Sequence, residues 1–206
     1  MRSELVFDDG GMNLLSSSAL QDIRAALPLD GSMFVFRSGR ERLFAAGADM
    51  VEMQRFTAWR AYEFARLGQE VFAAIERLPG LTVALIDGDC FGGALDLVLA
   101  FDLRFATPRS RFSHPGAKLG IVTGFGGTSR WRNALTRAAA NQLFLANRVF
   151  SSAEALAMGL LDRVADSHDD ELERLETIDA RGMKQLIRGG RVRGTRSRDH
   201  RVHDLL

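Results

Sequence analysis

Two glycine-containing turns stand at points where the backbone could bind a negatively charged oxygen. The segment FAAGADM, residues 44–50, precedes one helical pattern, and CFGGALDL, residues 90–97, precedes another. Backbone N–H groups at a helix N-terminus have no partner within the helix, and the helix dipole favours negative charge there. Two such donors that converge on one oxygen form an oxyanion hole. A glycine before a helix is usually only a turn, so the spacing alone favours a structural role.

A carboxylate follows the second glycine turn. Asp96 comes three residues after Gly93 and interrupts an apolar run. Because residues three apart share a helix face, Asp96 can point toward the same pocket as the turn and act there as an acid or base. The structural alternative is an aspartate that satisfies free N–H groups at a helix N-terminus. The residue types and the spacing leave both interpretations open.

The other reactive side chains form no familiar constellation. The four histidines and one cysteine lack metal-ligand spacing, so no metal site is predicted. Cys90, beside the second glycine turn, is interpreted as a small packed residue rather than a nucleophile. The segment GFGGTS, residues 124–129, lacks the third glycine and the acidic residue of a dinucleotide-binding fingerprint.

Composition is that of a globular protein. The 206 residues are 46% apolar and 26% charged, with a net charge of +1 that indicates neither a nucleic-acid nor a membrane partner. No signal peptide is expected, and no apolar stretch reaches the ~18 residues of a membrane span. The single cysteine fits a reducing compartment, and a cytoplasmic location is expected.

Short apolar strands alternate with helices along the chain, which predicts an α/β fold. The segments expected as strands are 32–38, 81–88, 103–108 and 110–114; those expected as helices are 14–27, 49–78, 93–100, 130–135, 137–147 and 151–159. Ser16 or Ser17 is the expected N-cap of the first helix. Ser151 or Ser152 is expected to begin the last of these helices and Gly159 to end it.

The chain changes character at Asp166, where it becomes strongly charged. We therefore divide it into a core, residues 1–165, and a short charged C-terminal region, residues 166–206. Residues 171–190 can form an amphipathic helix. The tail 191–206, with five arginines, is expected to be loosely ordered, with a phosphate or partner contact as the alternative.

The motifs FAAGADM, CFGGALDL, FSHPGAKLG and GFGG occur in an order and at a spacing that closely resemble the crotonase superfamily, the enoyl-CoA hydratase/isomerase family. The resemblance runs from about residue 14 to residue 164. It implies a crotonase-like spiral of ββα repeats, here with a shortened C-terminal helical region. It also implies a lyase or isomerase of fatty acid metabolism, assembled as a homotrimer or hexamer.

The resemblance also implies roles for individual residues. By position, the backbone N–H groups of Ala46 and Gly93 would form the oxyanion hole. The stretch Ala46, Gly47, Ala48 and Asp49 would bind coenzyme A through its backbone. Asp96 falls where the hydratases of this family carry their first catalytic glutamate, which favours the catalytic interpretation. Aspartate is one methylene shorter than glutamate, so its carboxyl would stand roughly 1.5 Å further back.

The second catalytic position departs from the family pattern. In hydratases the corresponding motif ends in Pro-Glu, whereas here it ends in Pro115-Gly116. Hydration needs both a base that activates water and an acid that delivers a proton, so the loss makes ordinary hydratase activity doubtful. His114 is a possible substitute, with Ser113 and Thr123 also nearby; a structural histidine is the alternative.

The predicted function is therefore an acyl-CoA-processing enzyme of the enoyl-CoA hydratase/isomerase type. It would act on an acyl-CoA or carrier-bound acyl thioester, with Asp96 as the single carboxylate acid/base. No cofactor is expected beyond the coenzyme A of the substrate, and neither nucleic acid nor membrane is expected as a partner. The alternatives are a thioester hydrolase or decarboxylase of the same fold, and a non-catalytic acyl-CoA-binding subunit.

Overall fold

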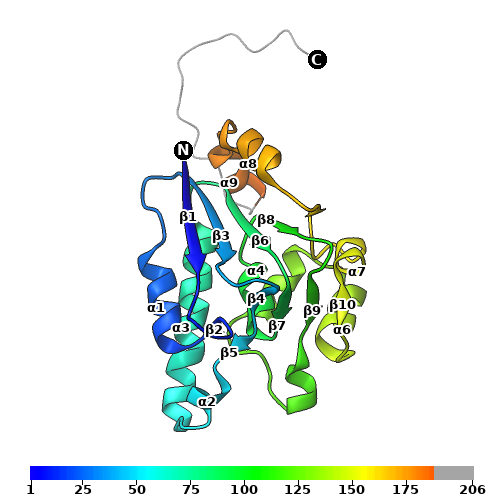
Figure 1. Ribbon diagram of the computed structural model, residues 1–206. Helices are drawn as coiled ribbons and strands as arrows, with labels where there is room; N and C mark the ends of the chain where they lie inside the picture. Colours follow the sequence, from blue (N-terminus) through cyan, green and yellow to red (C-terminus); the bar gives the residue numbers. More distant parts are fainter. Residues whose placement is uncertain (188–206) are drawn as a thin grey trace.

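The computed structural model of the protein describes residues 1–187 (Figure 1). The predicted tail 191–206 lies outside the described residues. The larger sheet has five parallel strands in the order β1-β3-β6-β8-β11. They are β1 (Arg2–Phe7), β3 (Met33–Ser38), β6 (Thr82–Ile86), β8 (Leu103–Ala106) and β11 (Arg163–Val164).

A smaller sheet has four strands in the order β10-β9-β7-β4, and a two-stranded sheet pairs β2 with β5. They are β4 (Leu43–Ala45), β7 (Asp89–Phe91), β9 (Arg111–Ser113), β10 (Phe150–Ser151), β2 (Leu14–Leu15) and β5 (Gly47–Ala48). Successive strands alternate between the two larger sheets: β3 then β4, β6 then β7, β8 then β9. This alternation confirms the predicted spiral of ββα repeats within an α/β fold.

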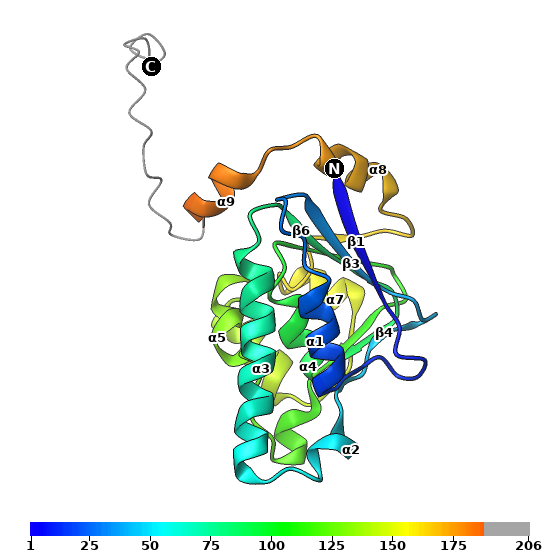
Figure 2. The ribbon, with the colours of Figure 1, turned by 90° about the vertical axis from the view of Figure 1, so that its left-hand side faces the viewer.

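Helices cover one face of the larger sheet. Helices α1 (Ser17–Ala25) and α3 (Ala58–Arg77) pack against each other and run side by side (Figure 2). The remaining α-helices are α2 (Met50–Met53), α4 (Gly93–Val98), α5 (Gly127–Arg130), α6 (Arg137–Leu145), α7 (Ser152–Ala157), α8 (Asp169–Glu176) and α9 (Arg181–Ile187). Two 3₁₀ helices, η1 (Pro115–Leu119) and η2 (Trp131–Asn133), complete the described elements.

Alternate residues of β3 enter two different apolar clusters. Phe34 and Phe36 point into the main core, whereas Met33 and Val35 join a second cluster that contains Leu172 of α8. Side chains of a strand alternate between its two faces, so a strand that is covered on both sides reads as one continuous apolar run. Helix α8 therefore covers the face of the sheet that α1 and α3 leave open.

Helix α9 is held to the core by a buried lysine. Lys184 Nζ donates to the Gly80 carbonyl at 2.6 Å and lies 2.7 Å from Asp102 Oδ2. Both views show α8 and α9 at the end of the molecule where β1 begins (Figures 1 and 2). The described part of the charged C-terminal region thus packs onto the core.

Two predicted helices are divided. The prediction of one helix over residues 49–78 is wrong, because Thr57 accepts a hydrogen bond from the Arg60 N–H and starts α3 as a separate helix. The helix predicted over 171–190 is likewise two helices within the described residues, α8 and α9. The predicted N-caps Ser16 and Ser151 are confirmed, and Gly159 follows α7 with a positive φ of 83°.

Candidate active site

Three glycines bring β5 against the turn that starts α4. Gly47 has a φ of +101°, and a Cβ on it would lie 2.8 Å from the Phe91 carbonyl oxygen and 2.9 Å from the Gly93 nitrogen. Gly92 also has a positive φ, +56°. Only glycine adopts such conformations readily, and only glycine permits this approach of one backbone to the other. The two glycine turns that are separate in the sequence are therefore neighbours in space.

The approach places two backbone amides side by side. Gly93 is the first residue of α4, so its N–H has no acceptor within the helix. A Cβ on Gly93 would lie 3.4 Å from the Ala48 nitrogen, and both residues line the same cavity. Gly93 and Ala48 therefore bring two backbone nitrogens to the same cavity.

The Ala46 amide is engaged elsewhere. Its N–H donates to the carbonyl of Met12 at 3.1 Å. The prediction that this amide is free to bind a substrate oxygen is therefore wrong, although Ala46 does line the cavity. The physical reason is that the segment 12–15 runs beside residues 46–48, so the Met12 carbonyl accepts the Ala46 N–H.

The cavity beside these turns has a volume of about 290 Å³. Its walls come from the two glycine turns, from α2 and α3, and from the segment that connects β9 to α5. They are mainly apolar, and the apolar lining residues are Met50, Met53, Phe56, Phe64, Leu119, Ile121, Val122 and Phe125, with several alanines. The polar side chains in the lining are His114 and Thr123. A mainly apolar cavity with a few polar groups is typical of a small-molecule site.

Asp96 lies behind this cavity rather than in its wall. The side chain is 0% exposed, and Asp96 does not contribute to the lining. Asp96 therefore meets this cavity through its neighbours, and its catalytic role stays a prediction. Its Oδ2 accepts a hydrogen bond from the hydroxyl of Thr123, and Oδ1 lies 3.9 Å from Nε2 of His114. Both of these neighbours line the cavity, so they stand between the carboxylate and the space for a substrate.

Burial raises the pKa of Asp96 to about 7. The opposing influences are the Thr123 hydroxyl, the Gly127 N–H and the positive charge of Arg130, each of which stabilises the carboxylate. A Cβ on Gly127, the first residue of α5, would overlap Asp96 Oδ1. The carboxylate thus lies at the start of α5, and its pKa suits proton transfer near neutral pH.

His114 reaches the cavity from the end of β9. It is 5% exposed, and burial lowers the pKa of its imidazole. Its ring centroid is 5.0 Å from that of Phe144 on α6. Ser113, the other candidate on this strand, does not line the cavity, but its carbonyl accepts the Gly92 N–H at 2.8 Å. Of the alternatives considered from the sequence, His114 and Thr123 are therefore the two that meet the cavity.

Gly116 leaves no room for a second carboxylate. A Cβ there would lie 2.7 Å from the carbonyl oxygen of Ile121 and 2.9 Å from Cε1 of His114. The Ile121 N–H donates to the Gly116 carbonyl at 2.9 Å, which closes this loop. The glycine is therefore required by the local backbone, and the imidazole of His114 stands beside the missing side chain.

Two other sequence candidates have structural contacts. The carboxylate of Asp49 caps α2 by accepting the N–H groups of Val51 and Glu52 at 2.9 and 3.0 Å. Cys90 is fully buried in the main core, and burial raises the pKa of its thiol, as expected of a packed residue. Within residues 1–187, no group of three or more His, Cys, Asp or Glu side chains could hold a metal ion.

Sequence reasoning missed Arg130. Its side chain is buried, donates to the Phe125 carbonyl at 2.6 Å and lies 3.0 Å from Glu76 Oε2. It fixes the loop that carries Phe125 and contributes positive charge near Asp96. Nothing in the sequence distinguishes it from the surface arginines around it.

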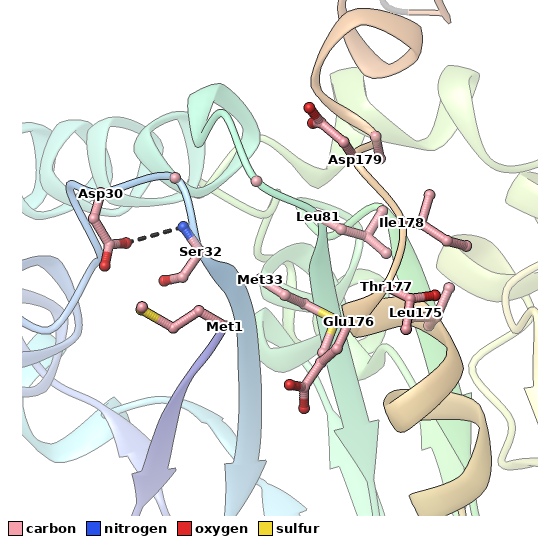
Figure 3. Close-up of a pocket in the computed structure, with 13 residues that line it drawn as sticks. Met1, Asp30, Ser32, Met33, Leu81, Leu175, Glu176, Thr177, Ile178 and Asp179 are labelled. Atoms are coloured by element: carbon pink, nitrogen blue, oxygen red, sulfur yellow. Dashed lines mark hydrogen bonds between the residues drawn. The ribbon is translucent and has the colours of Figure 1, made fainter.

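A second cavity, of about 370 Å³, lies away from the glycine turns (Figure 3). It opens between the start of β3 and the segment that joins α8 to α9. Asp30, Ser32, Glu176, Thr177 and Asp179 supply its polar side chains, and Asp30 accepts the Ser32 N–H at 2.9 Å. It shares no lining residue with the first cavity.

The spiral of ββα repeats, the two glycine turns and the buried acid define a crotonase-type protein. The sequence model of the enoyl-CoA hydratase/isomerase family matches residues 12–187, and the chain belongs to that family. None of the helices in residues 1–187 has both the length and the apolar character needed to cross a membrane.

Individual relatives support the same assignment. The chain is 34% identical over 164 residues to a crotonyl-CoA hydratase from Syntrophomonas wolfei, covering 77% of this chain and 63% of that protein. It is 33% identical over 165 residues to a mitochondrial methylglutaconyl-CoA hydratase from Rattus norvegicus, covering 78% and 52%. The chain thus spans between about half and two thirds of these proteins. A crystal structure of an enoyl-CoA hydratase/isomerase family protein from Hyphomonas neptunium superposes with a TM-score of 0.83 at 27% identity, covering 95% and 82%.

Proposed function

We propose that the protein transforms an acyl-CoA, or a carrier-bound acyl thioester, by way of a thioester enolate. One observation carries this proposal: a titratable buried carboxylate, Asp96, lies directly behind a cavity that also presents the Gly93 amide. An enolate-forming site needs these two elements, a group that moves the α-proton and donors for the oxygen that becomes negative.

The donors we assign are the N–H groups of Gly93 and Ala48. A thioester carbonyl oxygen placed between them gains charge as the α-proton leaves. The two amides then bind the enolate more tightly than the ground state, and this difference lowers the barrier. Loss of one such donor typically costs ~10²–10³ in rate. The apolar walls formed by α2, α3 and the 119–125 segment would hold the acyl chain.

Asp96 is the proposed acid/base. With a pKa raised to about 7, it exists in both protonation states near neutral pH. Its proton would reach the cavity through the two residues that separate it from the substrate, Thr123 and His114. One proton-transferring centre suffices for a double-bond shift, and it also suffices for α-proton exchange.

The relatives and the glycine at position 116 favour different reaction types. Two relatives are hydratases by name, which favours addition of water to an unsaturated acyl-CoA. The glycine at position 116 favours instead a reaction that needs only one carboxylate, such as isomerisation or decarboxylation. Thioester hydrolysis would use the same oxyanion hole.

A non-catalytic acyl-CoA-binding subunit is the second candidate. It is favoured by the position of Asp96, which does not reach the cavity wall, and by the closed loop at Gly116. In this case the cavity would bind a thioester without changing it.

A panel of acyl-CoA esters distinguishes these functions. The protein would be incubated with saturated, 2-unsaturated and 3-unsaturated esters, and mass spectrometry would follow water addition, double-bond position and free CoA. Conversion of at least one ester is expected. Tight binding of several esters with no conversion of any would contradict the catalytic proposal and support the binding subunit.

Three finer assignments belong to the same proposal. The backbone of residues 46–49 would hold the coenzyme A portion of the substrate, because Ala46 and Ala48 line the cavity just before α2. A homotrimer or hexamer and a cytoplasmic location are the assembly and the compartment that we expect.

A further inference from the structure

We propose that His114 is the group that exchanges a proton with the substrate, and that Asp96 acts behind it by orienting the imidazole and compensating its charge. This inference rests on the proposed function, because it assigns the proton transfer of that same site. It changes the role of Asp96 from a catalytic residue to a positioning residue.

The first argument is access. His114 lines the cavity, whereas Asp96 is fully buried and does not. A general base must come within hydrogen-bond reach of the proton that it removes. The Asp96 carboxylate contacts two residues of the cavity wall, Thr123 and His114, and is not itself part of that wall.

The second argument is the pairing of two unsatisfied atoms. Within the described residues, Nε2 of His114 is buried without a hydrogen-bond partner, and Oδ1 of Asp96, beside the Gly127 backbone, makes no hydrogen bond of ordinary geometry. They lie 3.9 Å apart, which is too long for a hydrogen bond and too short to admit a water molecule between them. Catalytic hydrogen bonds are often long in the absence of substrate and tighten when it binds. A small movement of the ring therefore joins the two atoms.

The third argument is the direction of the other ring nitrogen. A Cβ on Gly116 would lie 3.1 Å from Nδ1 of His114, and Gly116 is part of the cavity lining. The ring thus has one nitrogen toward the buried carboxylate and the other toward Gly116, a residue of the cavity lining. Phe144 packs against the ring at 5.0 Å between centroids and limits its movement.

The proposed proton transfer starts from a neutral imidazole and an ionised carboxylate. Neutral His114 carries its hydrogen on Nε2, directed at the ionised Asp96, and keeps a lone pair on Nδ1. The α C–H bond of the thioester breaks, its proton forms a new N–H bond at Nδ1, and the electron pair moves onto the thioester carbonyl oxygen. The resulting imidazolium is stabilised by the carboxylate, as in a His–Asp pair. Return of a proton to carbon regenerates neutral His114.

The charged and titratable groups that face this pair are few. The positive charge of Arg130 lowers the pKa of Asp96, and the Asp96 carboxylate raises the pKa of the Cys90 thiol. The groups around His114 are Asp96 from α4 and the uncharged Phe144 and Gly116. Titration of the pair therefore dominates the pH dependence of proton transfer.

The test compares His114→Gln with His168→Gln, each followed by α-proton exchange in D₂O with the converted ester. His168 is a matched control, because it is also buried, stacks on an aromatic ring, Phe105, and directly precedes α8, outside the cavity lining. His114→Gln is expected to lose about 10²–10⁴-fold in exchange rate with the Kd for the ester unchanged. His168→Gln is expected to keep the wild-type rate.

An NMR titration of the His114 ring provides a measurement that needs no His114 variant. Asp96→Asn is expected to shift the titration of His114, because the two groups titrate as a pair across the 3.9 Å contact between Nε2 and Oδ1. Full exchange in His114→Gln, or an unchanged His114 titration in Asp96→Asn, would overturn this inference and leave the proposed function intact. Absence of exchange in the wild-type protein across the whole panel would instead overturn the proposed function.

Discussion

The hydroxyl of Thr123 donates a hydrogen bond to Oδ2 of Asp96, and this contact joins a residue of the cavity wall to a carboxylate buried behind it. In the sequence the two residues are 27 positions apart. The bond stabilises the charged form of Asp96 against burial, which otherwise raises its pKa. Thr123 therefore helps to set the pH at which the site works.

Thr123→Val removes this hydroxyl and keeps the shape of the side chain. Because the hydrogen bond lowers the pKa of Asp96, its loss is expected to raise that pKa above about 7. The ascending limb of the pH–rate profile should move to higher pH. Thr128→Val, the same change at an exposed position on α5, should leave the profile in place. An unchanged profile in Thr123→Val would show that Asp96 does not govern the rate.

Asp96 should also make stability depend on pH. Its folded pKa of about 7 exceeds the ordinary value of 3.8, so between these pH values the folded protein retains a proton that the unfolded chain has released. The contribution of this group to the free energy of unfolding is therefore fully present below pH 3.8 and falls as pH rises toward 7. Asp96→Asn removes this contribution.

Urea unfolding at pH 5 and pH 8 measures the effect. Relative to the wild type, Asp96→Asn should gain about 2–3 kcal/mol over this interval, at ~1.4 kcal/mol per pKa unit. Asp22→Asn, at an exposed position on α1, should show no such gain. Parallel pH dependence in the wild type and Asp96→Asn would mean that the buried carboxyl does not titrate in this range.

A methyl group added at Gly68 should destabilise the protein. It lies within α3, where alanine ordinarily stabilises a helix by about 1 kcal/mol relative to glycine. Here a Cβ would overlap the ring of Phe125, which lines the cavity and lies close to Gly93. Gly68→Ala should therefore lose about 1–3 kcal/mol in unfolding free energy and weaken acyl-CoA binding.

Gly182→Ala is the matched control for this substitution. Gly182 is also helical, in α9, and a Cβ there meets no atom within 4 Å. Thermal and urea unfolding should show this variant at or above wild-type stability. A stabilised Gly68→Ala would contradict the packing described for Phe125.

Lys184 should anchor α9. Its ammonium group is buried and lies 2.7 Å from Asp102 Oδ2, so Lys184→Met takes this partner from a largely buried carboxylate. Removal of one member of a buried ion pair typically costs about 3–5 kcal/mol. Lys118→Met, at the one other lysine of the sequence, changes an exposed side chain and should cost little. Equal stability of the two variants, measured by urea unfolding, would argue against the anchoring role.

The residue pattern predicted an α/β fold because its signals are local, whereas the spiral of ββα repeats was implied by the resemblance to the crotonase superfamily. The apolar strands β3 and β6, the N-caps Ser16 and Ser151 and the C-terminal Gly159 each depend on a few neighbouring residues, and they occur where expected. Strand β1 was not predicted. The break at Thr57 was missed because a threonine in a charged, amphipathic run gives no helix-stop signal, whereas its hydroxyl caps α3 in the structure.

The site was only partly predictable, because its details depend on contacts between distant segments. Gly93 was identified from its place at the start of a helix. The engagement of Ala46 by Met12 depends on how residues 12–15 and 46–48 pair, which the sequence does not state. In the same way, Asp96 shares a face with Gly93 on α4, but the segment 121–127 folds across that face and covers the carboxylate.

The most direct test of the central claim is exchange of the α-proton of a bound acyl-CoA in D₂O, followed by mass spectrometry for wild type, Asp96→Asn and Asp22→Asn. An enolate-forming site predicts deuterium at the α-carbon with wild type and Asp22→Asn. With Asp96→Asn it predicts an exchange rate that is lower by at least about 10²-fold. Equal exchange by wild type and Asp96→Asn, or binding of the esters with no exchange by any of the three proteins, would contradict the account.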